Sequence, residues 1–173
     1  MSIATLELPP GIPSDGTVKV AVVPDEGFDD YHTPTVAEVQ AGTDISCHLM
    51  QDGYGESADE GTNTDQRLCS KEAYTIGGSV TWTITDLRYV YDPQNPSSLT
   101  HEAYAALAPG TIVYLVARWG KDAAEPWTAG DVVDVYRVQL GVQRKQTPEA
   151  NSELKVLQTP RVQGTKATDV ALT

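Results

Sequence analysis

The sequence predicts an all-β protein, a β-sandwich or open barrel with one short α-helix on its flank. Seven to nine short segments have strand-like alternation or valine-rich composition, and glycine and proline separate them. Only two segments have helical signals, and both are brief, which favours packed sheets over a mixed fold. With 173 residues, 40% hydrophobic and 21% charged, the chain can form one globular domain with a sizeable core.

The longest strand candidate covers residues 79–91, and the rest of the chain is arranged around it. Its apolar positions change phase midway, from Val80, Trp82 and Ile84 to Leu87, Tyr89 and Tyr91. Because a strand cannot turn over its apolar face without an extra residue or a bend, we expect a bulge or sharp twist near Thr85-Asp86. Strands usually have about 5–6 residues. This one is either a long sandwich strand or a strand that reaches beyond its own domain.

The N-terminal quarter predicts an arm, a strand and a short helix. Residues 1–16 are rich in proline and glycine and read as an extended arm, and residues 17–23 alternate weakly and are rich in valine. Thr35 and Glu38 fit a capping box, in which each side chain satisfies a free backbone donor. Gly42 ends this helix after one or two turns.

The next segments combine a strand with a polar excursion. Residues 44–50 are a strand candidate, and residues 51–65 hold three glycines and five acids with almost nothing apolar. We expect an exposed loop at 51–65 that orders against a neighbouring subunit. Calcium binding is the alternative, but the acids lack EF-hand spacing. Residues 66–76 predict one or two short strands before a turn at Gly77-Gly78.

The second half predicts a helix and further strands. A short helix is expected at residues 100–107, and Pro109-Gly110 stops it. Residues 111–119 are apolar on both faces, as in a strand that is covered on both sides. Strands follow at 131–140 and 153–158. The sandwich domain therefore spans residues 17–158, and residues 159–173 form a last edge strand or an arm.

The charge is negative and unevenly distributed. The net charge is −12, and residues 1–75 carry fourteen acids against three bases. Such a chain repels nucleic acid, whose binding requires clustered lysine and arginine. The acidic half faces a channel, a basic partner or simply solvent.

The cysteines and the N-terminal residues carry few signals of function or location. Cys47 and Cys69 lack metal-ligand spacing, so we expect reduced, buried thiols, with a disulfide as the alternative in an oxidising environment. The N-terminus has no basic region before an apolar run, and the longest apolar run, residues 112–117, is far below the ~20 needed to span a bilayer. We therefore expect a soluble protein made in the cytoplasm, without membrane insertion.

No motif predicts catalysis, a cofactor or a metal. His32, His48 and His101 lie in unrelated settings, and no nucleophile elbow or phosphate loop is present. The sequence therefore predicts a protein that is not an enzyme. Six aromatic residues could form a sugar-stacking platform, although such residues more often belong to cores or subunit contacts. These are Trp82, Tyr89, Tyr91, Trp119, Trp127 and Tyr136.

Several segments together resemble one protein family. They are Thr-Val-Ala-Glu-Val-Gln-Ala-Gly-Thr-Asp-Ile-Ser-Cys (35–47), Asp-Gln-Arg-Leu-Cys-Ser (65–70), Glu-Ala-Tyr (102–104) with Leu107, Tyr-Leu-Val-Ala-Arg-Trp-Gly (114–120), Ala-Gly-Asp-Val-Val-Asp-Val (129–135) and Pro-Glu-Ala-Asn-Ser (148–152). As a set they resemble the major tail tube proteins of long-tailed, siphovirus-type phages that infect actinobacteria. The resemblance runs from about Thr17 to the C-terminus.

This resemblance implies hexameric rings that stack head-to-tail, with strands of all six subunits closing an inner barrel that conducts DNA. It implies a virion tail protein that meets the tape measure protein and other tail proteins. The expected inter-subunit contacts are Asp52, Tyr54, Glu56, Asp59, Glu60, Asp65, Trp82, Tyr89 and Tyr91. Tail terminator and distal tail proteins share this sandwich, so fold alone does not choose among them. A carbohydrate-binding sandwich is the rival from another class.

Overall fold

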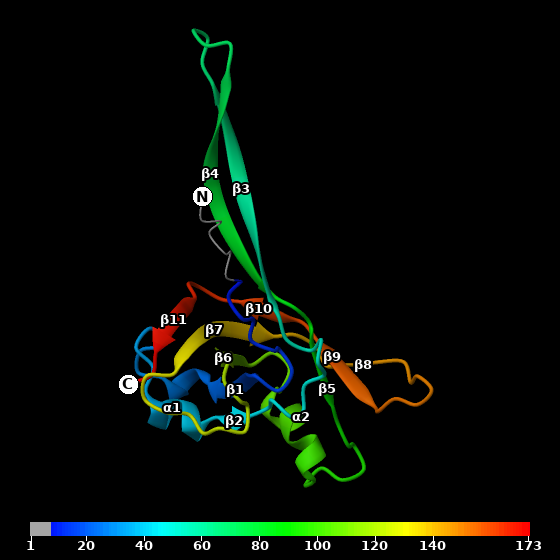
Figure 1. Ribbon diagram of the computed structural model, residues 1–173. Coiled ribbons are helices and arrows are strands. Elements are labelled where there is room, and N and C mark those ends of the chain that lie inside the picture. The colour runs from blue at the N-terminus through cyan, green and yellow to red at the C-terminus, as the bar shows by residue number, and fades with distance from the viewer. Residues whose placement is uncertain (1–7) are drawn as a thin grey trace, which may run out of the picture.

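The computed structural model describes residues 8–173 and consists mainly of antiparallel strands (Figure 1). The first seven residues of the expected arm lie outside the described part, and residues 8–15 have no regular structure. The strands are β1 Val18–Pro24, β2 Thr43–Asp44, β3 Glu56–Gln66, β4 Ala73–Ile84, β5 Leu87–Val90, β6 Ile112–Trp119, β7 Val132–Leu140, β8 Arg144–Lys145, β9 Lys155–Gln158, β10 Pro160–Val162 and β11 Ala167–Ala171. The helices are α1 Val36–Ala41 and α2 Glu102–Ala106, with 3-10 turns η1 Asp25–Gly27 and η2 Leu99–His101.

The strands form two sheets and one separate hairpin. The main sheet has the order β2-β1-β6-β7, and β10 and β11 pair one after the other with the free edge of β7. A second sheet has the order β5-β9-β8, and β3 pairs only with β4 within the described residues. The C-terminal residues therefore belong to the edge of the main sheet.

The core lies on both faces of the main sheet. β6 shows this best: Val113, Leu115 and Ala117 point into one cluster of buried side chains, and Tyr114 and Val116 into the other. The sequence had predicted this two-sided burial, and it is confirmed. The first cluster lies between the two sheets, and the second lies under α1 and the C-terminus.

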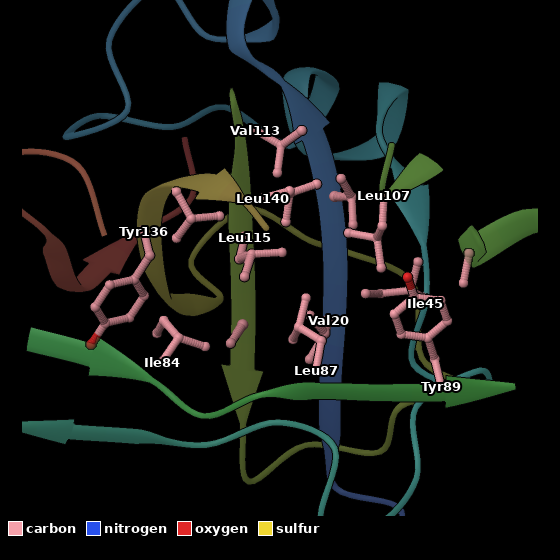
Figure 2. Close-up of a cluster of buried hydrophobic side chains, with 14 of the residues drawn as sticks. Val20, Ile45, Ile84, Leu87, Tyr89, Leu107, Val113, Leu115, Tyr136 and Leu140 are labelled. Atoms are coloured by element: carbon pink, nitrogen blue, oxygen red, sulfur yellow. The ribbon is translucent and has the colours of Figure 1, made fainter. Parts of the chain in front are cut away.

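The predicted long strand is broken where its apolar phase shifts. β4 ends at Ile84 and β5 starts at Leu87, so Thr85-Asp86 forms the expected bend. Because of the bend, both Ile84 and Leu87 point into the core, each at most 1% exposed. Figure 2 shows the segment that carries Ile84, Leu87 and Tyr89 crossing the strands that carry Val20 and Leu115.

Both predicted helices are present. Thr35 Oγ1 accepts a hydrogen bond from the Glu38 backbone N–H at 3.3 Å, and Glu38 Oε2 accepts from the Thr35 N–H at 2.8 Å, so the capping box at the start of α1 is confirmed. α2 follows η2 within the predicted segment 100–107. No helix within residues 8–173 is long and apolar enough to cross a membrane.

Four expectations were wrong in detail. The strand expected at 44–50 is reduced to β2, because Asp44 Oδ1 accepts from the Ser46 N–H at 2.9 Å and starts a turn. Most of the loop expected at 51–65 is strand β3, and the turn expected at Gly77-Gly78 lies inside β4.

The fourth wrong expectation concerns the cysteines. Both Cys47 and Cys69 are exposed and unpaired, so neither the expected burial nor the alternative disulfide is present. Cys69 lies in the turn between β3 and β4, which is largely exposed among the described residues.

Candidate assembly interface

A long two-stranded hairpin, β3 and β4, projects from the body of the molecule (Figure 1). Residues 56–60 pair with 80–84, and residues 62–66 pair with 73–77. Every residue of β3 except Asp65 is exposed, and β4 is exposed until Trp82. An isolated two-stranded hairpin is marginal in water, and free strand edges pair readily with another chain. The hairpin is therefore the part of this subunit that most requires a partner.

A bulge divides the hairpin into two halves. The register shifts between the pairs Glu60–Val80 and Thr62–Gly77, where β4 has one extra residue. A Cβ atom on Gly78 would lie 2.8 Å from the Gly61 carbonyl oxygen, so the chains approach this closely only with glycine. One extra residue exchanges the two faces of a strand. The apolar side chains of β4 thus face one way near the body and the other way near the tip.

The hairpin has an acidic strand and an apolar strand. β3 carries Glu56, Asp59, Glu60 and Asp65, whereas β4 has no charged residue. Four large hydrophobic side chains along the hairpin are exposed: Leu68, Tyr74, Ile76 and Val80. Exposed apolar groups gathered on one projecting element mark an interaction surface.

The base of the hairpin is firmly anchored. The Tyr136 hydroxyl donates to the Glu56 carboxylate, and the Thr85 N–H donates to the Gly55 carbonyl at 2.8 Å. Lys166 Nζ lies 3.1 Å from the centre of the Trp82 ring, a cation–π contact. These contacts fix the direction in which the hairpin leaves the body.

The anchor is also an electrostatic cluster. Burial and the nearby Asp134 raise the pKa of Glu56, while Lys166 opposes the rise. Burial raises the pKa of the Tyr54 hydroxyl, which has no hydrogen-bond partner among the described residues. Asp134 accepts from Trp119 Nε1 at 3.1 Å and from the Asp169 N–H at 2.9 Å. The base is thus held by a network from β3, β6, β7 and β11.

The structure groups most of the expected contact residues on this hairpin or at its base. Glu56, Asp59, Glu60 and Asp65 lie on β3, and Trp82 lies on β4. Asp65 pairs with Arg67 in the turn at 2.8 Å.

The remaining expected contacts lie below the hairpin. Asp52 is exposed and pairs with Arg88, and Tyr54 packs against the core and the Trp119 ring. Tyr89 and Tyr91 are buried, and the Tyr89 hydroxyl donates to Gln158 Oε1 at 2.8 Å. The rings of Tyr89 and Tyr91 thus pack in the core of the subunit.

The sequence pattern alone did not indicate the exposed apolar residues of the hairpin. Tyr74 and Ile76 alternate with Ala73 and Thr75, which was the available signal for a strand. Because a turn was expected at Gly77-Gly78, strand β4 was predicted as two separate strands. Leu68 carried no signal, since a single leucine in a polar segment has no periodicity.

The structure does not assemble the alternative sites. Tyr89, Tyr91, Trp127 and Tyr136 are buried in two separate clusters, so the six aromatic residues form no common platform. Within residues 8–173, no three histidine, cysteine or acidic side chains are grouped to hold a metal ion.

The comparisons with known proteins agree with this geometry. A family described as phage tail tube protein matches residues 6–173, nearly the whole chain. No curated protein matches the chain. The projecting hairpin, the all-β body and this match lead to one conclusion: the chain belongs to the phage tail tube protein family, whose members are structural components of the virion tail.

Proposed function

We propose that six copies of this chain form a ring, and that rings stack head-to-tail into a hollow tube that conducts DNA from capsid to host. The observation that supports this most is the β3–β4 hairpin, which is exposed along most of its length among residues 8–173. Strands from neighbouring copies pair with its edges and close a shared inner barrel.

The contact between the hairpin and another copy is heterologous, because the hairpin of one subunit meets a different surface of the next. Heterologous contacts close into rings or extend into filaments, whereas self-complementary contacts stop at pairs. A stack of rings needs both closure into a ring and extension into a filament.

The charge of the chain suits a DNA conduit. The net charge is −12, and β3 exposes Asp59 and Glu60. Since DNA binding requires neutralisation of phosphates by lysine and arginine, an acidic wall lets DNA pass without holding it.

The family resemblance extends the proposal to partners and origin. The tube encloses the tape measure protein during assembly and joins other tail proteins at its ends. The phage is of the long-tailed type that infects actinobacteria, and the host cytoplasm makes the protein. The chain acts by assembly and is not an enzyme.

A terminator or distal tail protein is the alternative with the same fold. Such a protein forms a single ring, so the discriminating observation is whether the purified chain extends into filaments. The carbohydrate-binding alternative predicts glycan-array binding by the monomer, but the dispersed aromatic residues give it no platform.

Negative-stain electron microscopy of concentrated protein tests the proposal. We expect long hollow filaments with a regular axial repeat. Monomers that persist at every salt concentration would contradict it, and isolated rings without filaments would favour the terminator alternative.

A further inference from the structure

We infer that the tip of the hairpin inserts Leu68 into a cavity beside β1 of a second copy of this chain. The inference rests on the proposed tube and names the surface that receives the hairpin.

The tip presents one apolar side chain among polar ones. The turn between β3 and β4 covers residues 67–72, and Leu68 at its apex is fully exposed. Leu68 shares the hairpin with the exposed side chains of Tyr74, Ile76 and Val80, and apolar groups gathered on one projecting element mark an interaction surface. We therefore place Leu68 in a pocket on another molecule.

A cavity of about 580 Å³ lies in the body, between the start of β1 and the segment before β3. Its apolar wall consists of Val18, Leu49, Met50, Tyr54 and Trp119, and Cys47 lies at the wall with its side chain exposed. The volume falls within the range of about 300–1,000 Å³ that encloses small ligands, so it admits the tip of a turn.

The hairpin cannot reach the cavity of its own subunit. Eleven residues in β3, at about 3.4 Å each, carry the tip on the order of 35 Å from the base. Figure 1 shows the hairpin directed away from the body, and Tyr54 at the cavity wall lies just before its base. A hairpin tip that fills this cavity must therefore come from another copy.

One pair of charges is complementary between the two surfaces. The turn carries Arg67, Lys71 and Glu72, and Arg67 already pairs with Asp65 at 2.8 Å, which leaves Lys71 as the cation available to a partner. Asp15 lines the cavity, where its carboxylate accepts from Gln51 Nε2 at 2.9 Å. None of the described residues that line the cavity is a lysine or arginine. Lys71 of the turn is thus available to pair with Asp15 of the receiving copy, and this pair favours one orientation of the docked turn.

The two free cysteines offer a direct test, since Cys69 follows Leu68 and Cys47 lines the cavity. Tubes are treated with a short bifunctional maleimide and resolved by denaturing electrophoresis. We expect a ladder of dimers, trimers and higher species from the wild type. Cys47→Ser and Cys69→Ser should each abolish the ladder, and a mixture of the two should give dimers only.

A second pair of variants tests the apolar contact. Leu68→Asp should raise the concentration needed for tube formation at least tenfold, and Cys47→Trp should do the same by filling the cavity. Val142→Asp is the matched control, because Val142 is also exposed, at 70%, and lies outside both surfaces. It should leave assembly unchanged, and all monomers should unfold at similar temperatures.

Three results would overturn the inference. The wild type could form tubes that give no cross-linked ladder, or Cys47→Ser could still give dimers through Cys69–Cys69 links. The third result is that Leu68→Asp assembles at the same concentration as the wild type. Protection of Cys47 from a monofunctional maleimide in the monomer would also overturn the inference, because the cavity would then be filled within one subunit. A wild type that forms no tubes contradicts the proposed function itself, so the two failures are distinguishable.

Discussion

Arg118 is the most deeply buried charge in the molecule, at 1% exposure, and it organises the loop between β6 and β7. Its guanidinium donates to Asp131 Oδ2 at 2.7 Å and to the carbonyl oxygens of Asp122, Glu125 and Pro126 at 2.8 to 3.0 Å. A buried charge is tolerated when it is paired and hydrogen-bonded. Both terminal nitrogens of Arg118 have such partners, whereas its Nε has none among the described residues. Arg118 thus converts a polar loop into a fixed part of the body.

Removing one partner of this pair should be costly. Asp131→Asn leaves Arg118 buried without its counter-ion, which typically costs about 3–5 kcal/mol. The matched control is Asp86→Asn, which breaks the exposed pair with Arg144 and should cost less than about 1 kcal/mol. Urea unfolding of the monomers at pH 7 measures both values, and equal losses would show that Asp131 has no special role.

The same carboxylate predicts a pH dependence. Burial alone would raise the pKa of Asp131, but hydrogen bonds from the Thr128 N–H, Arg118 and Lys121 outweigh burial and hold that pKa below its usual range. In the unfolded chain Asp131 has a pKa near 3.9, so it takes up a proton at a higher pH than in the folded chain. The stability that the ionised carboxylate contributes is therefore present above about pH 4 and is lost as the pH falls further. The stability difference between wild type and Asp131→Asn should narrow between pH 7 and pH 3. A constant difference would contradict the assignment.

Residue-level prediction from sequence succeeded where the signal is local. Thr35 and Glu38 form their capping box through side chains three residues apart, so the pattern alone contains the geometry. Cysteine burial is a tendency of the residue type and contains no information on position. Both cysteines are exposed.

At the scale of the element, the hairpin shows why strand prediction fails for an assembly interface. Alternation in sequence reports a strand with one buried face. β3 has no buried face within the subunit and only one alanine among polar residues, so it resembled a loop. The glycine pair that suggested a turn instead permits a bulge at Gly61 and Gly78. A strand without a buried face among the described residues of its own subunit lacks the usual pattern.

Shortening the hairpin separates folding from assembly. Replacing residues 61–79 by Asn-Gly joins Glu60 to Val80, which already face each other, through a two-residue turn that suits a hairpin. The removed residues contribute to no core cluster, and the anchoring contacts of Glu56 and Trp82 stay. We expect a monomer with a thermal unfolding midpoint close to that of the wild type and no filaments.

Electron microscopy and thermal unfolding check both parts of this expectation. Filaments formed by the shortened chain would show that the hairpin is not a required contact. A deletion of residues 51–65 would not be a clean test, because it removes Tyr54 from the core and Gly53 from its buried turn.

At the scale of the whole molecule, the body of the protein was predictable and its projection was not. Strands β1, β6, β7 and β9 have their apolar faces in the two core clusters, so their sequences report their burial. The bend at Thr85-Asp86 followed from the same argument. The hairpin, its tip and the cavity could not be predicted, because their apolar residues are separated in sequence and form no periodic pattern.

Cryo-electron microscopy of the assembled protein tests the central claim most directly. We expect rings of six subunits around a hollow lumen, with the β3–β4 hairpins of neighbouring copies side by side and each tip covered by the next copy. A map in which the hairpins extend into solvent without a partner, or in which a lone closed subunit holds a ligand in a cleft, would contradict it.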